Sequence, residues 1–172
     1  FEGGIGDIKN VWEASRFEWV VTLARAYAFS GKTIYLNTLN HWLSDWAEKN
    51  PVNIGPNWKC GQEAAIRVFN LIQAASILGQ WDVPSPALSE FIDRHLERIS
   101  ANISYAIAQD NNHGTSEAAA LFIGGNWLGK KASNKSEKLD SHTCDLQVMR
   151  GNDEGGSGND RSKKYDHFAS QG

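Results

Sequence analysis

A short polar stretch at residues 109–117 concentrates the side chains of this chain that could carry out acid–base chemistry. It places amides, an imidazole, two hydroxyls and two carboxylates between two apolar segments. His113 is a candidate base, and Asn112 beside it offers two N–H donors and a carbonyl without net charge. A neutral base next to an amide donor suits the removal of a proton adjacent to a carboxylate.

The same stretch is predicted to start a helix. Gly114 can serve as the N-cap, with Glu117 three residues later as the carboxylate that returns to it. His113 would then lie at the positive end of the helix dipole, which disfavours imidazolium and keeps the ring able to accept a proton. The alternative is a capped turn in which His113 and Asn112 only satisfy backbone groups.

A second pair of candidate residues lies near the start of the chain. Trp12 and Arg16 are four residues apart and therefore share one face of a helix. An indole and a guanidinium on one face can stack a sugar ring and bind a carboxylate or a sulfate. The alternative is a partly buried tryptophan with the arginine packed over it.

The long loop at residues 50–59 and the segment after it give a third group of candidates. Asn57 and Trp58 end the loop, and Glu63 and Arg67 follow at a spacing of four residues. A semi-buried arginine oriented by a glutamate would bind an anion well. The alternative is a solvated surface ion pair that contributes little.

Composition limits the classes of function that remain. The net charge of −3 over 172 residues indicates no nucleic-acid surface, and the length favours a single domain. No apolar run reaches the roughly 18 residues of a membrane span. Cys60 and Cys144 are expected to be free thiols, although one bridge between them stays open, and no spacing suggests a metal site. His41 and His95 are expected at the surface or its boundary.

The elements that must position these residues are predicted to be helices. Apolar residues recur at helical spacing over residues 8–29, 33–49, 60–78, 88–108 and 118–128. Strand signals are nearly absent, so we expect an all-α fold of stacked antiparallel helical hairpins, as in a bundle, a solenoid or an (α/α) toroid. Residues 1–130 form the helical portion, and residues 131–172 are a poorly patterned continuation with a glycine-rich stretch at 151–158.

Four stretches together resemble the helical domain of the heparinase II/III-like polysaccharide lyases. They are Trp-Glu-x-Ser-Arg at 12–16, Asp-Trp-x-x-x-Asn-Pro followed by Gly-x-Asn-Trp across 45–58, Glu-x-x-x-Arg followed by Asn at 63–70, and Asn-Asn-His-Gly with Ser-Glu at 111–117. Their order and spacing cover residues 7–128. The segment at 162–167 is weakly similar to the family's Ser-x-x-Tyr-His-Arg segment.

The resemblance implies an (α/α) toroid, here incomplete, whose groove holds an anionic polysaccharide such as heparin or heparan sulfate. Such lyases cleave uronic-acid-containing chains by β-elimination, without a cofactor or a metal. The resemblance assigns catalysis to Asn112, His113 and Tyr165. It assigns substrate binding to groove residues on four segments, namely Trp12, Arg16, Asn57, Trp58, Glu63, Arg67 and Glu117.

The resemblance also implies a periplasmic or secreted protein in which a β-sandwich domain follows the toroid. That domain is absent from this chain, which begins at Phe1 without Met, so we expect a fragment with little activity of its own. Asp166 stands where the family usually has His, which weakens the assignment of Tyr165. The alternatives are an alginate-type lyase, an inactive domain that binds acidic glycans, and a helical scaffold for a protein partner.

Overall fold

The computed structural model describes the backbone of residues 6–142 and the side chains of residues 6–129. This part of the chain is helical throughout and contains no strand, which confirms the predicted all-α class. The elements are α1 (Ile8–Ala14), α2 (Glu18–Ser30), α3 (Thr33–Lys49), the short 3₁₀ helix η1 (Pro56–Trp58), α4 (Gly61–Ile77), α5 (Pro86–Ser100), α6 (Ile103–Ala108) and α7 (Asn112–His142).

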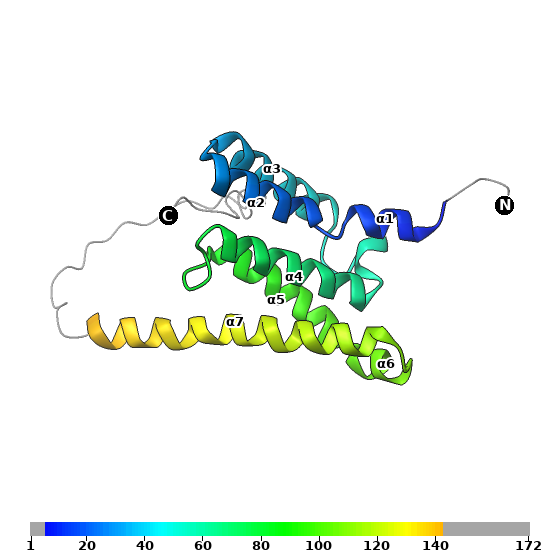
Figure 1. Ribbon diagram of the computed structural model, residues 1–172. Coiled ribbons are helices and arrows are strands. Elements are labelled where there is room, and N and C mark those ends of the chain that lie inside the picture. The colour runs from blue at the N-terminus through cyan, green and yellow to red at the C-terminus, as the bar shows by residue number, and fades with distance from the viewer. Residues whose placement is uncertain (1–5, 143–172) are drawn as a thin grey trace, which may run out of the picture.

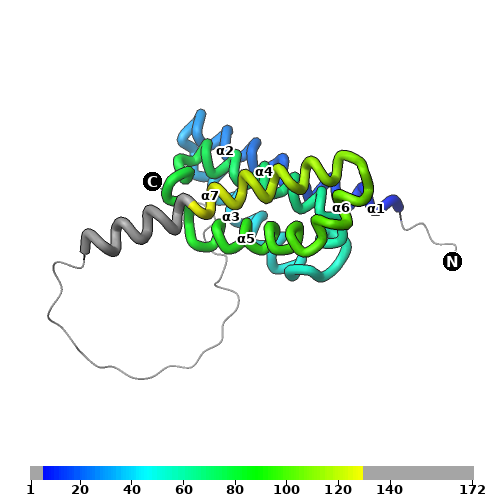
Figure 2. The backbone as a smooth tube through the Cα atoms, turned by 90° about the horizontal axis from the view of Figure 1, so that it is seen from below, coloured from blue at the N-terminus to red at the C-terminus, as the bar shows by residue number. Residues whose placement is uncertain are grey.

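The helices pair into hairpins that stack side by side, as Figure 1 shows. α2 packs on α3, α4 packs on α5, and α4 also contacts both α2 and α7. Seen from below, α7 runs along the line between α4 and α5 and contacts both (Figure 2). The short elements α1 and α6 and the start of α7 lie at the same end of the molecule (Figures 1 and 2).

One apolar core runs through the stack because each long helix turns an apolar face inward. Its fully buried residues come from several helices, among them Val20, Leu39, Val68, Ile92 and Ala120. Burial of this kind is the dominant favourable contribution to folding. Among the described residues, no helix is both long and apolar enough to cross a membrane.

The predicted helices over 33–49 and 60–78 are confirmed by α3 and α4, but the predicted single helix over 8–29 is wrong. The chain breaks between α1 and α2, where Phe17 has a φ of 67° in the left-handed region. This backbone conformation is costly for a residue with a side chain. The Phe17 ring is fully buried and lies 4.8 Å from the Trp46 ring, so packing in the core offsets the cost.

Two further helix boundaries differ from the prediction. The segment 88–108 is divided into α5 and α6 by a turn at residues 101–102, although apolar residues recur at helical spacing on both sides of it. The helix predicted over 118–128 is longer at both ends, because α7 begins at Asn112 and continues to His142. The predicted change of pattern near residue 130 therefore does not end the helix.

Candidate functional site

The start of α7 is capped by Asn111 and not by Gly114, so the predicted N-cap is wrong. The Oδ1 atom of Asn111 accepts a hydrogen bond from the backbone N–H of His113 at 2.9 Å. A side-chain oxygen satisfies an unpaired donor of the first turn, which glycine cannot do. Gly114 instead lies inside the helix, where an added Cβ would come within 3.4 Å of the Ala106 carbonyl oxygen of α6.

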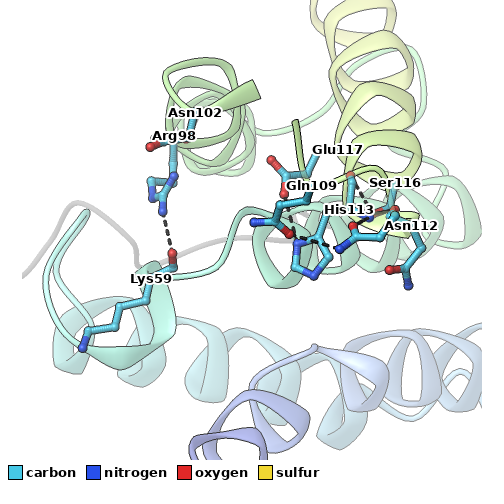
Figure 3. Close-up of polar contacts among 9 residues, drawn as sticks. Lys59, Arg98, Asn102, Gln109, Asn112, His113, Ser116 and Glu117 are labelled. Atoms are coloured by element: carbon cyan, nitrogen blue, oxygen red, sulfur yellow. Dashed lines mark hydrogen bonds and ion pairs between the residues drawn. The ribbon is translucent and has the colours of Figure 1, made fainter. Parts of the chain in front are cut away.

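An open pocket of about 210 Å³ lies where the start of α7 faces the segment before α4 (Figure 3). Its lining residues are Lys59, Cys60, Gly61, Arg98, Asn102, Tyr105, Gln109, His113 and Glu117. The pocket therefore brings His113 together with the chain that follows Trp58, although these segments are far apart in sequence. The His113 side chain keeps 27% of its surface exposed, so a bound molecule can reach its ring.

Glu117 is the partner of His113 in this pocket. Its Oε1 lies 3.6 Å from the Nδ1 of His113, one helical turn away on the same face of α7. The glutamate is 3% exposed, and this burial raises the pKa of its carboxyl group. Since Glu117 faces one ring nitrogen, the other nitrogen of His113 is the one available to a molecule in the pocket.

The Glu117 carboxylate also lies against Gly61, the first residue of α4. A Cβ added at Gly61 would lie 2.7 Å from Oε1 of Glu117, which is too close for real atoms. Glycine at this position therefore lets the carboxylate approach the start of the helix. The N-terminal end of a helix dipole favours a negative charge there.

The backbone of residues 56–59, which we call the wall segment, is held by side chains at each of its four carbonyl oxygens. The indole Nε1 of Trp12 donates to the Pro56 oxygen at 2.9 Å. Arg67 Nη2 donates to the carbonyl of residue 57 at 2.7 Å. Arg98 donates from Nε to the carbonyl of residue 58 and from Nη2 to that of residue 59, both at 2.7 Å.

Behind the wall segment lies a buried centre around Arg67, which has no exposed surface. Its guanidinium carbon is 5.2 Å from the centre of the Trp46 ring and 5.6 Å from that of Trp58, distances typical of cation–π contacts. Its Nε donates to Nε2 of His95 at 3.0 Å. Burial lowers the pKa of Arg67 to about 10, so the side chain is still charged at neutral pH.

His95 is fully buried, so its predicted surface position is wrong. Its Nε2 accepts from Arg67, and its Nδ1 lies 2.7 Å from the Phe91 carbonyl oxygen, to which it donates as a neutral ring. Burial and then the charge of Arg67 lower the pKa of His95 to about 3. The helical spacing of His95 from Phe91 and Ile99, both buried, was the signal for its position.

Four predicted binding residues in or near the wall segment have almost no surface of their own. Trp58 is 2% exposed, Asn57 5%, Glu63 4% and Arg67 0%. The expectation that these side chains line a groove is therefore corrected. The predicted pair of Glu63 with Arg67 is also wrong, because Glu63 binds Arg16 at 2.8 and 2.9 Å.

The remaining predicted residues lie outside the pocket lining. Trp12 and Arg16 are partly exposed and contact the wall segment and Glu63. Asn112 is exposed and is not among the residues that line the pocket. Tyr165 lies outside the described residues. Of the predicted set, the pocket thus brings together His113 and Glu117.

Several lining residues were not predicted from the sequence, notably Arg98, Tyr105 and Gln109. Gln109 belongs to the polar stretch singled out above, and Lys59 directly follows Trp58. The sequence around Arg98 and Tyr105 does not predict that they line a pocket, because their position there depends on how α5 and α6 turn toward the wall segment. Within the described residues no group of three His, Cys, Asp or Glu side chains could hold a metal ion.

Fold and pocket define an all-α protein of stacked helical hairpins with a histidine–glutamate pair in an open pocket at one end. Comparisons of the chain with protein-family models, with curated proteins and with solved structures found no match.

Proposed function

We propose that this chain is the helical portion of a periplasmic or secreted polysaccharide lyase that cleaves uronic-acid-containing anionic polysaccharide by β-elimination. The observation that carries the proposal is the position of His113, which faces an open pocket with Glu117 3.6 Å from its Nδ1. The resemblance of four sequence stretches to the heparinase II/III-like lyases supports the same activity, and a substrate like heparin or heparan sulfate.

In this proposal His113 is the base. The reaction removes the proton on the carbon next to the uronate carboxylate and expels the glycosidic oxygen on the neighbouring carbon. With Glu117 facing Nδ1, the other ring nitrogen takes the proton, and the imidazolium that forms is stabilised by the carboxylate. Glu117 thus orients the base and offsets its charge after proton transfer.

The charges around the pocket suit an anionic substrate. Arg98 lies in the lining, and the Lys59 ammonium is at the outer rim, directed away from His113 (Figure 3). Their combined potential attracts carboxylate or sulfate groups over a distance set by ionic strength. The proposal assigns Asn112 to the uronate carboxylate from the adjoining surface, and Tyr165 to protonation of the leaving oxygen.

The test is the substitution His113→Ala, assayed on heparan sulfate, hyaluronan and alginate by the ultraviolet absorbance of the unsaturated uronate product. Loss of a general base is expected to lower kcat by roughly 100-fold or more, with little change in the free energy of unfolding. His41→Ala, at an exposed histidine of α3, is the matched control and should keep full activity. The assay is made on the full-length protein, and if that protein gives no absorbance rise on any of the three polymers, the lyase proposal is wrong.

A second candidate is an acidic-glycan-binding domain without chemistry. The position of Asn112 outside the pocket lining favours it, because an elimination needs a group that neutralises the uronate carboxylate. Calorimetric titration with a heparan sulfate oligosaccharide separates the two candidates. Binding without turnover selects the binding domain, and neither binding nor turnover contradicts both.

A further inference from the structure

We propose that Arg98 is the positioning residue of the pocket: its guanidinium fixes the wall segment and is not itself a group that binds ligand. The inference rests on the proposed function in one respect, namely that this pocket is the binding site. It adds a residue that determines the geometry of the pocket. Arg98 lies on α5, outside all four sequence stretches that resemble the lyase family.

The guanidinium of Arg98 bridges two neighbouring carbonyl oxygens of the wall segment. Arg98 reaches from the last turn of α5 to two successive carbonyl oxygens, those of Trp58 and Lys59, both at 2.7 Å. These carbonyls directly precede α4, where no helical donor is available to them. The planar fork of an arginine spans two neighbouring acceptors in a fixed geometry, whereas the single ammonium of a lysine does not.

The donors of Arg98 that face the wall segment are committed to it. Nε donates to one carbonyl oxygen, and one of the two N–H bonds of Nη2 donates to the next. The third nitrogen, Nη1, is buried and has no hydrogen-bond partner among the described residues. Arg98 therefore contributes to the pocket through its stem and its long-range charge, and through the backbone that it holds.

The wall segment connects Arg98 to the histidine–glutamate pair. Residues 59–61 form one side of the pocket, and Gly61 touches the carboxylate of Glu117. If the wall segment moves, Gly61 moves with it, and Glu117 is free to leave its place beside Nδ1 of His113. Arg98 thus sets the distance between two groups that it does not touch.

The experiment compares Arg98→Lys with Arg94→Lys, an exposed position one turn earlier on α5. Amide hydrogen exchange is followed by mass spectrometry in the whole protein without any ligand. In Arg98→Lys we expect exchange over residues 55–61 to rise by about tenfold or more, with the α2–α3 hairpin unchanged. The ring carbon–proton NMR signal of His113 is expected to shift in Arg98→Lys and to stay in place in Arg94→Lys.

Unchanged exchange over 55–61, or an increase spread over the entire protein, would overturn the inference. Arg98→Met serves as a second variant without charge, and if it does not fold, Arg98→Lys decides the question alone. Both measurements are made without substrate, so their outcome is independent of whether the lyase proposal holds. Where turnover is found, a fall in kcat is expected, and a rise in KM with unchanged kcat and unchanged exchange would mean that Arg98 binds the ligand.

Discussion

The buried centre and the open pocket each place a histidine beside a charged partner, and they lie on either side of the wall segment. In the buried centre both ring nitrogens of His95 are engaged, and its pKa is lowered to about 3. In the pocket His113 has one partner, Glu117, and more than a quarter of its side chain is exposed, at 27%. The same residue type therefore serves packing in one region and is available for proton transfer in the other.

His95 and His113 differ in their access to solvent and in how many of their ring nitrogens have a partner, not in residue type. Arg67 and Arg98 repeat the comparison, because both donate to carbonyls of the wall segment. Arg67 does so from the buried side, surrounded by aromatic rings, and Arg98 does so from the pocket side. The buried centre thus supports the wall segment from behind the pocket, and four changes test this division from the largest effect to the smallest.

Arg67→Ala is expected to lower the free energy of unfolding most. The change leaves His95 Nε2 and the Asn57 carbonyl without a donor and opens a cavity among aromatic rings, which together cost about 3–5 kcal/mol. Arg94→Ala, which removes an exposed arginine with ion pairs to its own helix, is expected to cost under about 1 kcal/mol. Urea unfolding measures both, and equal losses would show that the buried centre is not the support of the wall.

A second test separates the two regions by pH. The pKa of His95 falls from 6.5 to about 3 on folding, so the unfolded chain binds a proton in this range that the folded chain does not. The contribution of His95 to the free energy of unfolding is therefore fully present above pH 6.5. It is lost as the pH falls toward 3, by roughly 1.4 kcal/mol per pH unit. Replacing His95 by Gln should flatten this slope, whereas His41→Gln should leave it unchanged.

Glu117 is expected to act in the opposite direction in the same urea experiment. Burial raises its pKa above 4.5 in the folded chain, so the folded chain holds the proton more tightly just above that value. The free energy of unfolding then falls as pH rises through this window. Glu117→Gln should remove that fall, and parallel curves for all variants would contradict the assignment of both groups.

The smallest expected effect on stability is that of Gly61→Ala. The new Cβ meets the Glu117 carboxylate, the far end of a flexible side chain, so the carboxylate moves and the helix stays, at a cost under about 1 kcal/mol. The His113 NMR signal should nevertheless shift, because its partner leaves. Gly125→Ala, where an added Cβ meets nothing within 4 Å, is the matched control. A loss above about 2 kcal/mol would show that the backbone gives way instead.

Helical spacing predicted the class of fold and two long helices, because apolar faces that pack on one core recur at the helical period. It could not show the break at Phe17 or the turn at residues 101–102. The helical spacing continues across both breaks, although α1 has no buried residue and the core cluster takes none of its residues from α1 or α6. The left-handed backbone of Phe17 is held by rings from α3 and α5, namely Trp46 and Phe91, which no local pattern reports.

The candidate site was predicted in part for a similar reason. The polar stretch 109–117 and the chain after Trp58 do meet at one pocket. The spacing of Glu63 and Arg67 predicted a local pair, but Arg16, which is 47 residues away from Glu63, provides the partner. His95 has charged neighbours in sequence, and these predicted a position at the surface. Its helical spacing from buried apolar residues indicates the buried position that it has.

The contact between Gly61 and Glu117 has a consequence for how this chain can vary. With 2.5 Å between an added Cβ at position 61 and the Cδ of Glu117, the two positions cannot both carry large side chains. A side chain at 61 displaces the carboxylate from His113, so sequences that keep the histidine–glutamate contact should keep glycine at 61, and those that gain a side chain at 61 should have a shorter residue at 117. A covariation of this kind, between positions on separate helices, would be a record in evolution of the same close approach.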